Sequence, residues 1–202
     1  LLALDLAAER GTLLTYLLAG AVLAMAALAG HSQTLLLMLY AGTLYYGFHV
    51  LTGPSRTQAP GSNGQRRRLL LSRAAGFSVI VGIGAALAAA QLLPTAEYAL
   101  LSTRAGLGFV ESSKGMPPLQ LLQLLIPGAV SAFSSPLYVG FISLWLAFTV
   151  VAARRDRTVG IWVALALLAL LDTLGGYSYF YNLLYMFAPG FALFRGQERA
   201  AV

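Results

Sequence analysis

The chain has 202 residues, of which 58% are hydrophobic and only 10% are charged, whereas an ordinary soluble domain carries about 25% charged residues. Mean hydropathy is +0.76, and several apolar runs approach the roughly 20 residues that span a bilayer. This composition excludes a soluble domain and predicts an integral membrane protein. The absence of cysteine also excludes a disulfide framework, an Fe–S cluster and thiol chemistry.

Five membrane spans are predicted, and each must be a helix because every backbone polar group in lipid needs an internal partner. The fold class is therefore all-α: a polytopic transmembrane helix bundle with short interfacial or re-entrant helices at its outer face. The predicted spans are residues 11–30, 34–52, 69–93, 137–153 and 159–175, with an outer loop at 94–136 and an outer C-terminal segment at 176–202. We expect one transmembrane domain, residues 1–202, that is part of a longer protein, since the chain starts without Met.

The turn between the first two spans reads Gly30-His31-Ser32-Gln33 and places an imidazole beside an amide. Two interpretations are open: His31 and Gln33 cap a helix, or they belong to a polar site. His49 lies near the other end of the second span, so the two histidines cannot form a metal pair.

The third span is rich in glycine and alanine, which let helices approach closely. A central packed helix and a wall lining a cavity both fit this pattern. The arginine run Arg66-Arg67-Arg68 before it is interpreted as a topology anchor, with contact to anionic lipid phosphate as the alternative.

Basic residues predict the orientation. Of the 13 Lys and Arg residues, nine lie on one side of the predicted spans, and the positive-inside rule places that side in the cytoplasm. The net charge of +6 therefore reflects membrane topology and does not indicate nucleic acid. The nine are Arg10, Arg56, Arg66, Arg67, Arg68, Arg73, Arg154, Arg155 and Arg157. His31 and the loop 94–136 are then outside.

Uncommon polar residues gather on this outer side, and Asp172 and Gln91 are the deepest of them. An ionisable group at membrane depth is a hypothesis of function by default. Asp172 fits a base, a metal ligand or an ion pair with Arg195 or Arg199. Gln91 fits either a hydrogen bond from its side-chain amide that bridges two helices or a ligand contact.

The second half of the outer loop, PPLQLLQLLIPG, begins and ends with proline. This framing predicts a short interfacial helix with Gln120 and Gln123 on one face. The tyrosines after the fifth span suit an interfacial aromatic belt, or they could stack on a sugar or a lipid headgroup. The two arginines near the end could grip a phosphate.

Short motifs in consistent order resemble the YfhO-type bacterial membrane proteins, a family similar to the GT-C glycosyltransferases. They cover nearly the whole chain. They are Gly30-His31-Ser32-Gln33 with Tyr40, the run Gln91 to Tyr98 with Ser102 and Arg104, Pro117, Pro127-Gly128, Tyr138 with Gly140, Gly175-Gly176-Tyr177, and Pro189-Gly190-Phe191 with Phe194, Arg195 and Arg199.

The resemblance implies transfer of a sugar from a polyprenyl-phosphate carrier at the outer face of the bacterial cytoplasmic membrane. Membrane lipid and the lipid-linked sugar are then the partners. GT-C glycosyltransferases usually place the catalytic carboxylate in the first outer loop. The first outer loop here has none, so we expect that residue before Leu1, with Asp172 and Glu97 as weaker candidates. The predicted substrate-binding residues are His31, Gln33, Gln91, Glu97, Tyr98, Arg104, Tyr177, Arg195 and Arg199.

Two other functions stay open at this stage. The missing carboxylate also fits a non-catalytic subunit or scaffold with protein partners, and the small-residue third span also fits a transporter of lipid-linked sugars. No inverted repeat of the transporter type is visible. No phosphate-loop, HExxH, GxSxG or dinucleotide motif is present, so no cofactor is evident, although a divalent metal fits the expected chemistry.

Overall fold

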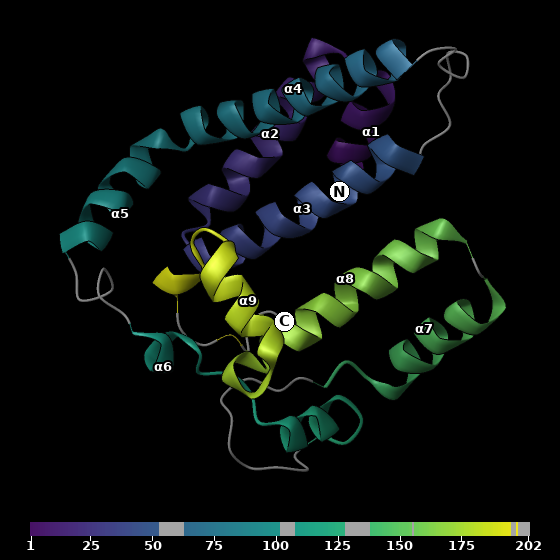
Figure 1. Cartoon of the computed structure of the whole chain (residues 1–202), viewed down its shortest axis with the longest axis vertical. Coiled ribbons are helices and arrows are strands. Elements are labelled where there is room, and N and C mark those ends of the chain that lie inside the picture. The colour runs from purple at the N-terminus through teal and green to yellow at the C-terminus, as the bar shows by residue number, and fades with distance from the viewer. Residues whose placement is uncertain (53–62, 102–107, 128–137, 155, 195–196, 198–202) are drawn as a thin grey trace. The chain divides into compact units, whose positions relative to one another are not determined.

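The computed structural model describes residues 1–52, 63–101, 108–127, 138–154, 156–194 and 197 (Figure 1). These residues are helical or irregular and include no strand, which confirms the all-α prediction. The chain divides into two compact units, Leu1–Leu101 and Ser102–Val202, and each is described by itself. Whether the 202 residues form one membrane domain stays a prediction.

The first unit contains α1 (Leu2–Arg10), α2 (Leu13–Leu28), α3 (Ser32–Thr52), α4 (Asn63–Leu87) and α5 (Ala89–Leu101). The sequence explains the bend between α1 and α2: Gly11 ends α1 at a φ of 62°, a conformation that glycine tolerates best. Thr12 then begins α2 through a reciprocal capping box with Thr15.

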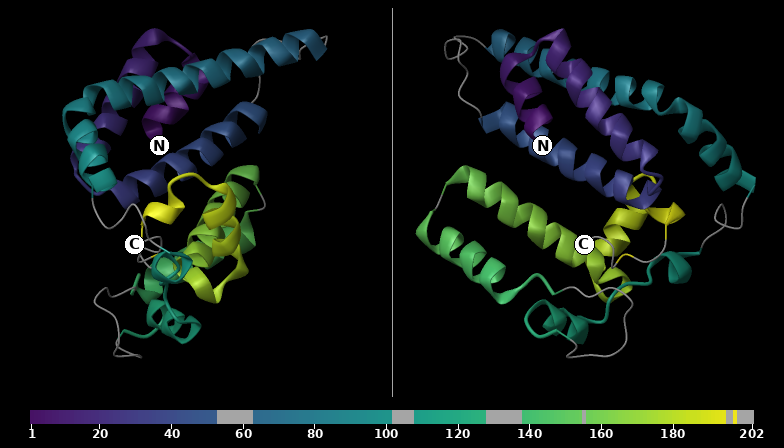
Figure 2. Two further views of the ribbon diagram at one scale, coloured as in Figure 1. Left: turned by 60° about the vertical axis from the view of Figure 1, so that its left-hand side comes forward. Right: turned by 180° about the vertical axis from the view of Figure 1, so that it is seen from behind.

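The closest packing in this unit is between α2 and α4, which cross against each other (Figures 1 and 2). A Cβ atom built on Gly20 of α2 would lie 2.6 Å from the side chain of Ile83 on α4. A Cβ on Gly76 of α4 would lie 2.6 Å from the Tyr16 hydroxyl. The small residues of the third predicted span therefore do permit a close helix approach, as the first interpretation of that span required.

Two helices in the described part of the chain are long and apolar enough to cross a bilayer, Ser32–Thr52 and Arg67–Leu87. The other three predicted spans form shorter helices: α2 has 16 residues, α7 (Phe141–Ala153) has 13 and α8 (Arg157–Thr173) has 17. The structural evidence for membrane association therefore consists of two helices. That all five predicted spans cross the membrane stays a prediction.

The third predicted span, residues 69–93, differs from the structure at its outer end. The helix breaks at Ala88, and α5 then continues through Pro94 to Leu101. Pro94 lies inside α5, lacks an amide proton and crowds the carbonyl four residues earlier, that of Ala90, so it weakens the first turn after the break without ending the helix. Residues 94–101, which we expected in a loop, are therefore helical.

The second unit contains α6 (Phe109–Ser112), η2 (Pro118–Leu124), α7, α8, η3 (Gly175–Tyr177), α9 (Tyr179–Phe187) and η4 (Phe191–Leu193). Figure 2 shows α7 and α8 side by side, with α9 turning back at the end of α8. The short helix predicted between the two prolines is present as the 3₁₀ helix η2, which begins directly after Pro117.

Helix η2 buries its two glutamines, while two of its leucines are exposed and the other two are half-buried. Residues three apart share a face in a 3₁₀ helix, so Gln120 and Gln123 lie together as predicted, and only 4% and 5% of their surface is exposed. Leu119 and Leu122 are exposed. This is the reverse of a helix on the surface of a soluble protein.

Candidate functional site

The candidate site lies where α8 ends, and two backbone segments distant in sequence hold it together. The amide of Met116 donates to the carbonyl of Thr173 at 2.8 Å, and the amide of Gly176 donates to the carbonyl of Ser113 at 2.7 Å. A Cβ atom on Gly115 would lie 2.5 Å from the amide nitrogen of Gly175. Only glycine at position 115 allows the two segments to approach this closely.

Gln197 forms hydrogen bonds with the segment that contains Ser113 and Gly115. Its backbone amide donates to the carbonyl of Lys114 at 3.0 Å. Its side-chain Nε2 lies 3.1 Å from the carbonyl oxygen of Ser112, 3.1 Å from the Tyr181 hydroxyl and 3.3 Å from the carbonyl oxygen of Phe194. Gln197 is 1% exposed, so these hydrogen bonds form away from solvent.

Asp172 is the unusual group at this site. It belongs to the last turn of α8 and is 3% exposed. Neither carboxylate oxygen has a hydrogen-bond partner among the residues that the structure describes, and the same holds for the buried Oε1 atom of Gln120. A buried charge is costly unless it is paired, so Asp172 needs a partner. The predicted partners Arg195 and Arg199 lie outside the described residues.

Tyr181 lies beside this carboxylate and is fully buried. Burial raises the pKa of its phenol, and the negative charge of Asp172 raises it further, while hydrogen bonds with Ser112 and Gln197 oppose the shift. The phenol therefore stays protonated, and its hydrogen bond joins α9 to Gln197. Ser112, Tyr181 and Gln197 were not among the predicted site residues. Ser112 and Gln197 lie in polar stretches, VESSKG and RGQERA, so no signal in the sequence would single them out.

In the first unit, the structure brings Gln91 to the turn that contains His31. The Nε2 atom of Gln91 lies 3.3 Å from the position that a Cβ on Gly30 would take. His31 is exposed, and its Nδ1 atom lies 2.8 Å from Oγ1 of Thr34 and accepts from the Thr34 amide at 3.3 Å. The capping interaction is therefore present, while ligand binding by His31 stays a prediction.

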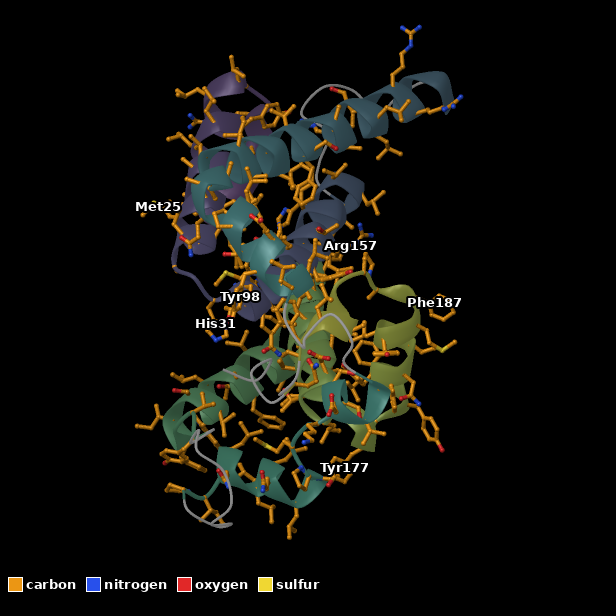
Figure 3. The ribbon with its side chains drawn as sticks, turned by 90° about the vertical axis from the view of Figure 1, so that its left-hand side faces the viewer. Met25, His31, Tyr98, Arg157, Tyr177 and Phe187 are labelled. Carbon is orange, nitrogen blue, oxygen red and sulfur yellow. The ribbon has the colours of Figure 1, made fainter. Side chains whose placement is uncertain are left out.

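The remaining predicted binding residues of the described chain differ in their surroundings. Gln33 is buried in α3, whereas Glu97 is exposed and Tyr98 is 74% exposed on α5 (Figure 3). Tyr177, in the second unit, is 62% exposed. Arg104, like Arg195 and Arg199, lies outside the described residues. Their binding roles stay predictions.

Within the described ranges, no group of three or more His, Cys, Asp or Glu side chains is arranged to hold a metal ion. Comparisons of the chain with models of known protein families, with curated proteins and with solved structures found no match.

Proposed function

We propose that this chain is part of a multi-pass glycosyltransferase of the bacterial cytoplasmic membrane. In this proposal it transfers a sugar from a polyprenyl-phosphate carrier to an acceptor hydroxyl at the outer face. The observation that carries the proposal is the buried Asp172 carboxylate, which has no hydrogen-bond partner among the described residues. Carboxylates of this kind, shielded from water, are frequent in sites that bind or deprotonate a substrate.

The surface of the second unit fits a membrane protein. Large apolar side chains of α7 are exposed, including Ile142 (74%) and Phe148 (70%). In α9, Phe187 is 77% exposed (Figure 3). Contiguous exposed apolar surface marks contact with a membrane or another protein, and the reversed polarity of η2 fits the same environment.

The proposed reaction uses Asp172, one of the two weaker candidates from the sequence, as the general base in place of a carboxylate before Leu1. The acceptor oxygen forms a bond to the anomeric carbon of the sugar, and its proton moves to the Asp172 carboxylate. The bond from that carbon to the carrier phosphate breaks, and polyprenyl phosphate leaves with the electron pair. An acceptor hydroxyl would also supply the hydrogen-bond donor that Asp172 lacks. The predicted arginines would stabilise the leaving phosphate.

The test is release of polyprenyl phosphate from radiolabelled polyprenyl-phosphate hexoses by the protein in proteoliposomes. This product is the same for every acceptor, so an extract of bacterial envelope glycans and lipids can supply the acceptor without its identity being known. Asp172→Asn should lower the rate by about 10²- to 10⁴-fold, which is the usual contribution of a general base. Asp156→Asn is the matched control, because Asp156 precedes the other end of α8 and is exposed. Equal rates in folded wild-type and Asp172→Asn protein would refute the role of Asp172.

A non-catalytic subunit is the second candidate, and the exposed face of α7 favours it. Phe141, Trp145 and Leu146 are also more than half exposed on this helix and could pack against a partner helix. Purification in a mild detergent separates the two candidates. A stoichiometric partner that cross-links to α7 supports the subunit, whereas an active chain purified alone supports the enzyme.

A further inference from the structure

A second polar cluster, absent from the predicted site, lies in the first unit between α1 and α3. The Tyr45 hydroxyl donates to Oδ2 of Asp5 at 3.1 Å. The other carboxylate oxygen, Oδ1, forms an ion pair with Nε2 of His49 at 3.6 Å. Asp5 comes from α1, and Tyr45 and His49 come from successive turns of α3. These contacts therefore exist only while α1 is folded onto α3.

The charge on His49 decides how favourable this contact is. Oδ1 of Asp5 and Nε2 of His49 are both shielded from solvent, and neither has a hydrogen-bond partner among the described residues. Their separation of 3.6 Å exceeds the range of about 2.7–3.2 Å for an N–H···O hydrogen bond. The shielded carboxylate oxygen is therefore compensated by attraction between opposite charges, since a buried charge without a partner is costly. An uncharged imidazole would leave this oxygen without compensation.

The other titratable and charged groups around α1 keep one charge state near neutral pH. Among the described residues, those on α1 and on the helices packed against it are Glu9 and Arg10 of α1, Tyr16 of α2, Tyr45 and Tyr46 of α3, and Arg73 of α4. Glutamate, tyrosine and arginine ordinarily do not change their charge between pH 5 and 8, whereas histidine does. A pH change in this range therefore acts on the contact through His49.

The C-terminal end of α1 is held by contacts that do not depend on pH. The guanidinium of Arg73 donates to the carbonyls of Ala7 and Ala8, and a guanidinium stays charged throughout the range in which proteins are stable. Ala7 is also fully buried, in a core cluster with side chains of α2 and α4. Only the first half of α1, which carries Asp5, therefore depends on His49.

We propose that the ion pair of Asp5 with His49 is a pH-sensitive contact that controls whether the first half of α1 stays on α3. A carboxylate is negative above about pH 5, so only the protonated imidazole attracts it. The contact is then strong at mildly acidic pH and weakens as the pH rises and the imidazole loses its proton. The proposal is independent of the proposed sugar transfer, since the ion pair lies in the other unit and uses no residue of the Asp172 site.

The experiment measures amide hydrogen exchange in α1 of the whole chain in detergent, at about pH 5.5 and about pH 8. Rates are divided by the intrinsic exchange rate at each pH, and α2 is the internal reference. In the wild type, the protection of α1 relative to α2 should fall by about 5- to 10-fold from the lower to the higher pH. This is the contribution of an ion pair whose side chains are 33% and 30% exposed while its facing atoms are shielded.

The two histidines of the chain supply a matched pair of variants. His49→Gln and Asp5→Asn each remove one charge of the pair, so the protection of α1 should be independent of pH and as weak as in the wild type at high pH. His31→Gln removes the other imidazole and should keep the wild-type pH dependence. Tyr45→Phe removes only the hydroxyl, so it should lower protection at both pH values and keep the pH dependence.

Three results would overturn the proposal: equal protection of α1 at both pH values in the wild type, a pH dependence that persists in folded His49→Gln or Asp5→Asn, or its loss in His31→Gln. Circular dichroism of every variant separates loss of the contact from loss of the fold. A failure to release polyprenyl phosphate would count against the proposed enzyme and leave this proposal standing, because the two experiments test different residues.

Discussion

The hydrogen bonds of Gln197 predict that Gln197→Leu strongly destabilises the second unit. The substitution keeps the approximate size of the side chain and the backbone bond to Lys114. It removes the side-chain donor that serves the carbonyl of Ser112, the Tyr181 hydroxyl and the carbonyl of Phe194. The perturbation therefore acts on hydrogen bonding rather than on packing.

The magnitude follows from the number of donors. An amide group has two N–H bonds, so two of the three acceptors are bonded at one time, and each bond contributes about 1 kcal/mol net. The carbonyl of fully buried Ser112 is then left unsatisfied, which costs about 1–3 kcal/mol more. The free energy of unfolding should fall by about 3–5 kcal/mol. For a unit of this size, the midpoint temperature of thermal unfolding should fall by about 10 °C or more.

The assay is thermal unfolding in detergent, followed by circular dichroism, combined with a double-mutant cycle. Tyr181→Phe removes the hydroxyl that bonds Gln197 and keeps the ring. Because the two groups contact each other, their separate effects should exceed the effect of the double mutant by at least about 0.5 kcal/mol. Two results would refute this account of the site. One is strict additivity of the two changes in unfolding free energy, and the other is a decrease of less than about 1 kcal/mol for Gln197→Leu alone.

Three further predictions concern backbone contacts. Gly115→Ala should destabilise the protein by at least about 1–3 kcal/mol, the usual cost of overpacking, because its Cβ would lie 2.5 Å from the backbone of Gly175. Gly160→Ala should instead stabilise it by about 0.5–1 kcal/mol, since Gly160 is helical and has open space around its Cβ position. Arg73→Met should speed hydrogen exchange in α1, because it removes charged hydrogen bonds to the carbonyls of Ala7 and Ala8, each contributing about 1.5–3 kcal/mol.

These predictions control for one another. Gly115→Ala and Gly160→Ala add the same methyl group, so a similar unfolding midpoint for both would contradict the close approach at Gly115. Arg73→Met should leave exchange in α8 and α9 unchanged if the two units unfold separately. Slower exchange in α1, or equal acceleration throughout the chain, would contradict the capping role of Arg73.

Much of the helical content followed from the sequence, because apolar run length and turn residues act locally. The predicted short helix between Pro117 and Pro127 is present, and so is the common face of Gln120 and Gln123. The break at Ala88 and the helical residues up to Leu101 were missed. A proline after an apolar run can end a helix or only bend it, and the sequence around Pro94 does not distinguish the two.

In the candidate sites, too, the sequence indicated single residues, whereas their contacts were found only in the structure. Asp172 stood out in the sequence as an acidic residue within an apolar run, and Gln91 was expected at membrane depth on the same side as the first outer turn. Gln197 and Ser112 are 85 residues apart, and Asp5 lies far from His49 in the sequence, so neither pairing has a local signature. The sequence could name single polar residues but not their partners.

The sequence by itself determined an apolar, helical chain and the residues whose burial would be costly, because hydropathy and helix propensity depend on near neighbours. Only the tertiary structure decided where their contacts go. The fold of α1 onto α3 brings Asp5 to His49, and the approach of Gly115 to Gly175 forms the site at the end of α8. Such contacts join segments distant in the chain, and they form only where small residues and matching hydrogen bonds let the backbones meet.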